Sequence, residues 1–458
     1  MPELVARIGR ARLMGLAAVI AAAVLALGVL VLSLGSGDDP APDQASPAQG
    51  QLSSPTKQQF STAATPEASP TPIKHAGILD GVAMSDQEWA ERKDLLPLAV
   101  MVDNTTGAYP HTGLDTADLV YEALVEGGIT RLMAVYWRLE AAKILPVRSA
   151  RTPFVIWASE LGALYGHAGG AVTENDANAM GQIYEWEILD LNAFSTIPSN
   201  YYYRDAERYG PYDLATSTDD LREAADRMGF SGPSAVESWK FRDPGTLLPS
   251  GKPAGGIAVD FSGRLYAWQY IQWKWDAGAN RYLRFQFGGP HVDAVSGEQL
   301  AFASVIVMQA PSQVVDDDGH LIYDQLGTGP ATVFTGGQAF EGTWKKQKRE
   351  SRTRFYTLAG EEIVFERGPV FVEFISSQST FAYVAAAGDL PTMPAYEPPP
   401  PGSFPVPEDA GPSPSPSSVP TPTASASPGT TATAAPSPAG TPSPSATAQP
   451  PKSATPGP

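Results

Sequence analysis

The chain has 458 residues and carries 49 Asp and Glu against 31 Lys and Arg, a formal net charge of −18. A body this acidic repels phosphate backbones and shows no Lys/Arg stripe that offsets the charge, so we expect no nucleic-acid partner. The chain has no cysteine, which excludes disulfides, thiolate metal sites and a lipidated N-terminal cysteine.

The N-terminus predicts a membrane anchor. Residues 13–34 are uncharged and mostly apolar, long enough to cross a bilayer as one helix. Three arginines precede this run, and no Lys or Arg follows it before Lys57. The positive-inside rule therefore places the basic residues 1–12 in the cytoplasm and the rest of the chain outside, in a single-pass cell-membrane protein. The alternative is a cleaved signal peptide, although its apolar run is usually shorter.

Two segments lack the composition to fold. Residues 391–458 hold 22 Pro and 20 Ser or Thr with four charged residues, and residues 35–75 are similarly rich in Pro, Ser, Thr and Gln. Such segments bury too little apolar surface to offset the entropy cost of ordering, so we expect a disordered linker and a disordered tail. The folded body is then about residues 76–390.

Within this body, residues 76–235 predict an α+β or α/β lobe. Apolar runs at 97–102, 118–125 and 129–137 favour strands. Residues 150–161 have helical spacing and lead into a further strand that ends near His167. A second helix begins at Thr218, a candidate N-cap, and stops at Gly229.

A stretch rich in Gly, Pro and Ser at 236–255 predicts the linker between two lobes. After it the pattern changes to short runs separated by Gly, Asp and Asn turns, at 257–261, 265–275, 281–287, 303–309, 331–335, 353–356 and 370–375. We therefore predict a mostly antiparallel β lobe over 256–390.

Several ordered motifs resemble one family. They are LAVMVDN at 98–104, GLDTADLVYEALVEGGITR at 113–131, PVRSAR at 146–151 and HAGG at 167–170, with YRDAERYGPYDLATST at 203–218, YLRFQFGGPHVD at 282–293 and GTW at 342–344. Together they resemble the YerB-like lipoproteins, catalogued as domain of unknown function 3048. The resemblance implies a membrane-tethered protein outside the cytoplasm with an N-terminal lobe and a β-rich C-terminal lobe. It implies no particular reaction, because the family has no established activity. Many of those relatives look Cys-anchored, whereas this chain has only its helix.

The candidate binding residues are arginines. Arg131, Arg148 and Arg151 lie near predicted strand ends, with Asn104 and Ser149 close by in sequence. Guanidinium groups so placed bind a phosphate or carboxylate with two parallel hydrogen bonds. The competing interpretation is that these arginines pair with Asp103, Asp118, Glu122 or Glu126 and only tie the lobe together.

Asp103, Glu122 and His167 are the candidate catalytic residues, as the proton donor and acceptor that hydrolysis or group transfer needs. A turn or core role is the alternative for His167. No metal site is predicted, since no two of the five histidines have the spacing of helical ligands, and no cofactor motif is present. Trp268, Tyr270, Trp273 and Trp275 form either a sugar-stacking face or part of a β core.

These features predict an anchored extracytoplasmic protein that binds an anionic cell-envelope ligand through the arginines. One alternative is an envelope hydrolase or transferase acting on a phosphate- or carboxylate-bearing substrate. The sequence therefore leaves open whether the protein is an enzyme. Another alternative is a scaffold that binds an envelope protein through the β lobe.

Overall fold

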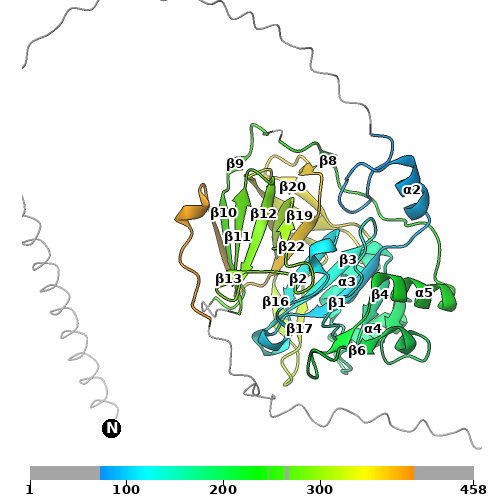
Figure 1. The fold of residues 1–458 in the computed structure, drawn as a ribbon. Helices are drawn as coiled ribbons and strands as arrows, with labels where there is room; N and C mark the ends of the chain where they lie inside the picture. The colour runs from blue at the N-terminus through cyan, green and yellow to red at the C-terminus, as the bar shows by residue number, and fades with distance from the viewer. Residues whose placement is uncertain (1–72, 246, 264–267, 397–458) are drawn as a thin grey trace, which may run out of the picture. The chain divides into compact units, whose positions relative to one another are not determined.

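A computed structural model describes residues 73–245, 247–263 and 268–396. This part has far more strand than α-helix, and its four α-helices are α2 (Asp86–Arg92), α3 (Thr152–Leu161), α4 (Ala179–Glu185) and α5 (Thr218–Met228). Short 3-10 helices occur at η1 (Thr106–Ala108), η2 (Leu114–Thr116), η3 (Glu126–Gly128), η4 (Pro198–Tyr201) and η5 (Ala387–Asp389). The result is a mixed, sheet-rich fold (Figure 1).

The largest element is an 11-stranded sheet. Its strands run in the order β20 (Arg354–Thr357), β19 (Gln338–Lys346), β18 (Gly327–Thr335), β15 (Ser304–Gln309), β22 (Val370–Ile375), β2 (Leu119–Leu124), β3 (Thr130–Tyr136), β1 (Leu98–Asp103), β4 (Leu164–His167) and β5 (Leu189–Asn192), and β9 (Lys252–Pro253) pairs with β19. The pairing of β2 with β22 is parallel and joins strands from both predicted lobes. Strands from before and after the predicted linker at 236–255 therefore belong to the same sheet.

A second, 6-stranded sheet is antiparallel throughout. It consists of β13 (Gly289–Pro290), β12 (Arg281–Gln286), β11 (Tyr270–Asp276), β10 (Gly256–Asp260) and β23 (Thr380–Val384), with β14 (Ala301–Phe302) on β12. Small two-stranded pairs are β16 (Ser312–Val314) with β17 (Leu321–Tyr323), β21 (Phe365–Glu366) with β8 (Phe241–Arg242), and β6 (Tyr203–Arg204) with β7 (Leu214–Ala215). The mostly antiparallel character predicted for the C-terminal lobe is confirmed.

Aromatic packing joins the two sheets. The Trp273 ring on β11 lies edge-on to Phe371 on β22, with ring centroids 4.9 Å apart, and to Phe302 at 5.9 Å. Trp273 and Tyr270 are buried, so they belong to the core and not to an exposed sugar-stacking face. Burying rings of this size supplies much of the apolar surface that stabilises the fold.

Local sequence explains the elements of the first lobe. Strand β1 is buried along its whole length, as expected for a continuous apolar run in the middle of a sheet. Helix α5 carries Asp219 and Asp220 in its first turn and ends at Gly229, whose φ is 75°. Its N-cap is Ser217, whose hydroxyl accepts the Asp220 backbone N–H, so the prediction of Thr218 as the cap is off by one residue.

No helix in these described ranges is long and apolar enough to span a membrane. The anchor predicted over 13–34 lies outside them. So do residues 35–72 of the linker predicted over 35–75 and residues 397–458 of the tail predicted over 391–458.

Candidate functional site

Three neighbouring parallel strands end at one edge of the main sheet. Strand β4 pairs in parallel with both β1 and β5, and their last residues are Asp103, His167 and Asn192. Helix α3 begins beside this edge. Ligands of open α/β sheets bind at the carboxyl ends of such strands, where loops are free to shape a site.

The segment 146–151 is fixed against this edge by backbone hydrogen bonds. The Arg148 N–H donates to the Met101 carbonyl of β1, and the Ala168 N–H donates to the Arg148 carbonyl. The Ala150 N–H reaches the Gly169 carbonyl at 2.9 Å. Two motifs that are apart in sequence, PVRSAR and HAGG, therefore run side by side at the ends of β1 and β4.

The structure brings the three predicted arginines together at this edge. Arg131 lies directly across from Asp103 in the β1–β3 pairing. Its Nη1 donates to the Ser149 carbonyl at 2.9 Å, and Arg151 is the residue that immediately precedes α3. We call Arg131, Arg148 and Arg151, with their partners Asp103 and Glu126, the arginine site.

Each arginine has a carboxylate neighbour. Arg148 Nε lies 2.6 Å from Asp103 Oδ2. Arg151 Nε donates to Glu126 Oε2 at 2.7 Å and its Nη2 also contacts that carboxylate, while Arg131 lies 3.6 Å from it. The pairing that the sequence offered as the competing interpretation is thus present. Three guanidinium groups share two carboxylates, which leaves one positive charge in excess.

Burial and these charges shift the pKa values in the site. Burial would raise the pKa of Glu126, but the charges of Arg131 and Arg151 outweigh it and lower that pKa to about 2. Burial and the neighbouring Arg151 lower the pKa of Arg131 to about 10. At neutral pH both groups are therefore charged. The side chain of Arg148 is 31% exposed, against 4% for Arg131 and 15% for Arg151, so Arg148 is the arginine of this site that solvent reaches most.

Glu122 does not join the arginine site. Strand residues alternate between the two faces of a sheet, and Arg131 is the cross-strand partner of Ala123, whereas Glu122 pairs with Leu132. Glu122 therefore points to the opposite face. There its Oε1 accepts the Asn104 amide at 2.9 Å and the Thr130 hydroxyl at 2.6 Å.

This opposite face holds a buried polar cluster, the interior network, which sequence reasoning did not identify. Arg284 Nη2 of β12 lies 2.5 Å from Glu122 Oε2, and both side chains are fully buried. Glu373 of β22 is the cross-strand partner of Glu122 and accepts the Trp273 indole N–H at 2.8 Å. In the sequence, the only sign of this network was Arg284, a charged residue within the strand predicted over 281–287. The network crosses from one sheet to the other and belongs to the core.

A histidine pair adjoins this network. His111 Nδ1 lies 2.8 Å from His291 Nε2, and the other ring nitrogen of His291 contacts Arg284. Burial lowers the pKa of His111 to about 4. Burial and the charge of Arg284 lower the pKa of His291 well below its usual value. Both rings are therefore neutral at neutral pH.

His167 is fully buried at the end of β4, and both of its ring nitrogens have partners. Nε2 lies 2.8 Å from Asp190 Oδ1, and Nδ1 lies 2.7 Å from the Gly169 carbonyl. These contacts fix the HAGG loop against β5. The catalytic roles suggested for Asp103, Glu122 and His167 stay predictions, since the three side chains do not meet in one open space.

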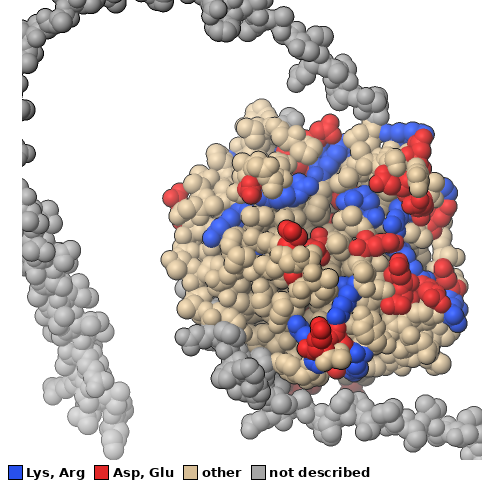
Figure 2. All heavy atoms as spheres, viewed as in Figure 1, with Lys and Arg blue, Asp and Glu red and all other residues tan. Residues whose placement is uncertain are grey.

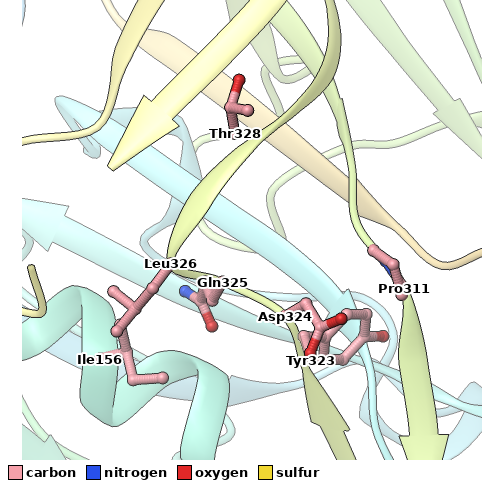
Figure 3. Close-up of a pocket in the computed structure, with 7 residues that line it drawn as sticks. All are labelled: Ile156, Pro311, Tyr323, Asp324, Gln325, Leu326 and Thr328. Atoms are coloured by element: carbon pink, nitrogen blue, oxygen red, sulfur yellow. The ribbon is translucent and has the colours of Figure 1, made fainter. Parts of the chain in front are cut away.

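Within 73–396, excluding the two undescribed gaps, no group of three or more His, Asp or Glu is arranged to hold a metal ion. A hollow of about 470 Å³ opens elsewhere, between α3 and the β17–β18 segment (Figure 3). Its lining residues are Ile156, Pro311, Tyr323, Asp324, Gln325, Leu326 and Thr328, none of which is a predicted site residue. Figure 2 shows acidic and basic side chains interspersed on the face in view, with no field of one sign.

Comparison with known proteins identifies similar sequences and one similar structure. Residues 81–231 match the family described as "Protein of unknown function (DUF3048) N-terminal domain", and residues 257–372 match the corresponding C-terminal domain. The protein named "Putative lipoprotein YerB" of Bacillus subtilis is 27% identical over 265 residues, which cover 57% of this chain and 76% of that protein.

The crystal structure of YerB from Bacillus subtilis has a similar fold. It aligns with a TM-score of 0.59 at 23% sequence identity, over 68% of this chain and all of that chain.

Proposed function

Because the chain belongs to the DUF3048 family and carries both of its domains in order, we propose that it is an extracytoplasmic envelope protein that binds an anionic ligand at the arginine site. The lipoprotein name of the Bacillus relative supports a location at the membrane. In this chain the apolar run at 13–34 would serve as the anchor.

One observation carries the ligand proposal: three arginines converge on two carboxylates at the carboxyl edge of β1, β4 and β5. Arg148 is the contact residue, since its side chain is the most exposed of the three. Arg131 and Arg151 add positive charge behind it. A planar guanidinium matches the oxygens of a phosphate or carboxylate.

The test is binding of inorganic phosphate and of polyglycerol phosphate to the full chain in detergent, measured by titration calorimetry. We expect the double variant Arg148→Ala, Arg151→Ala to bind about tenfold more weakly or worse, because charge-assisted hydrogen bonds are lost. Arg148→Lys keeps the charge but loses the planar fork, so it should retain intermediate affinity.

The matched control is Arg204→Ala, Arg227→Ala, which removes two exposed guanidinium groups outside the arginine site. Its affinity should equal that of the wild type. Urea unfolding of each variant separates lost binding from lost folding, since in the double variant Asp103 loses Arg148 and Glu126 loses Arg151. Undiminished binding by a folded double variant would rule the proposal out.

The hydrolase or transferase alternative gains no support from the geometry. A general acid or base must come within hydrogen-bond reach of its substrate. Asp103, Glu122 and His167 are all buried and paired with protein groups. Among the residues that the structure describes, no observation favours the scaffold alternative.

A further inference from the structure

Two tyrosines adjoin the arginine site. The Arg148 guanidinium carbon lies 5.9 Å from the centre of the Tyr212 ring. Tyr209 packs edge-on against Tyr212, with ring centroids 5.6 Å apart at an angle of 86°. Tyr209 is 48% exposed, so the ring that packs against the neighbour of Arg148 faces solvent.

The fold holds these rings in place. The Tyr212 ring lies directly on the backbone of Gly107, where an added Cβ would come within 2.3 Å of Tyr212 Cε2. Arg208 spans the same loop and donates to the Ala108 and Pro110 carbonyls. The Tyr212 N–H donates to the Tyr209 carbonyl at 2.9 Å. A platform built this way loses little freedom when a ligand packs on it.

Further rings extend from this platform. Burial and the neighbouring phenols of Tyr212 and Tyr396 raise the pKa of Tyr209. Tyr396 in turn packs on Phe287 at 4.9 Å, and Phe287 packs on Tyr109 at 5.1 Å. We call Tyr209, Tyr212 and Tyr396 the tyrosine strip. Tyr212 is the member that contacts Arg148, and the strip combines aromatic faces with hydroxyl groups.

We propose that the anion bound at the arginine site is the phosphate of a phosphate-bearing glycan, whose sugar rings lie on the tyrosine strip. This rests on the proposed function, because the phosphate contacts Arg148. The C–H face of a pyranose packs on an aromatic ring, and tyrosine hydroxyls hydrogen-bond to sugar hydroxyls. A glycan with widely spaced phosphates also suits a chain of net charge −18 better than nucleic acid, which carries a phosphate on every nucleotide.

The experiment compares inorganic phosphate, phosphorylated dextran, unmodified dextran and uridine monophosphate as ligands of the full chain. We expect phosphorylated dextran to bind more tightly than phosphate and unmodified dextran to bind weakly. Tyr209→Ala should reduce the affinity for phosphorylated dextran about fivefold and leave phosphate affinity unchanged, because only the ring contact is lost. Tyr209→Phe keeps the ring and should stay within about twofold of wild type.

Tyr184→Ala is the matched control, since it removes a tyrosine that is 89% exposed on α4. It should leave every affinity unchanged. The glycan inference fails if phosphate binds but phosphorylated dextran binds no more tightly than phosphate. It also fails if Tyr209→Ala binds phosphorylated dextran as tightly as wild type does. In both cases the arginine site stands. Tighter binding of uridine monophosphate than of phosphorylated dextran would replace the glycan with a nucleotide. If phosphate itself does not bind, the proposed function and this inference both fail.

Discussion

Replacing Glu373 with Gln should change how stability depends on pH. Glu373 and Glu122 are cross-strand partners on β22 and β2, and both are fully buried. Arg284 forms its ion pair with Glu122. Burial and the charge of Glu122 raise the pKa of Glu373 well above its usual value. The folded protein therefore holds Glu373 as the neutral acid, with Trp273 as a further hydrogen-bond partner.

The sign and size of this change in the pH dependence of the free energy of unfolding follow from proton linkage. Above the unfolded pKa, about 4.5, the folded state holds one more proton than the unfolded state, so stability is fully present below this pH and falls as pH rises toward the folded pKa. Within this window the free energy of unfolding drops by about 1.4 kcal/mol per pH unit. A Gln side chain still accepts from Trp273 and donates to Glu122 without a titrating proton. Over two pH units inside the window the variant should gain roughly 3 kcal/mol over wild type.

The assay is urea unfolding of both proteins at half-unit steps from pH 4.5 to 8, plotted as the difference between them. Asp118, whose pKa burial raises to about 7, and His111 titrate in both proteins and cancel in that difference. The control variant Glu341→Gln replaces a partly exposed carboxylate that pairs with Lys252. Its difference in free energy of unfolding from wild type should not rise with pH. Parallel pH curves for wild type and Glu373→Gln would refute the reasoning.

Three further variants test the interior network and a helix cap. Arg284→Met should lower the free energy of unfolding by about 3–5 kcal/mol, because Glu122 is left as a buried charge without its partner; urea unfolding measures this, and a loss below about 1 kcal/mol would contradict the ion pair. Ser217→Ala should lower it by about 1 kcal/mol, since the Asp220 N–H loses its acceptor at the start of α5. Ser217→Asp restores an acceptor and should recover most of that loss, whereas equal stability of all three proteins would show that the cap contributes nothing.

The sequence alone determined the features that depend on short-range patterns. The unbroken apolar run at 97–102 specified the buried strand β1, and the acidic first turn and final glycine specified α5 to within one residue. Regularly spaced turns indicated the antiparallel character of the later strands. The family motifs also identified both matched domains. Such signals are local, so each is readable from a window of a few residues.

Tertiary structure decided which charged groups meet. Arg131 and Glu122 are close in sequence and both lie near strand ends, but strand alternation directs them to opposite faces of the sheet. Arg284 and Glu373 enter the interior network only because β12 and β22 pack against β2, more than 150 residues away in sequence. No local pattern encodes contacts of that range, because they depend on how whole sheets pair and pack.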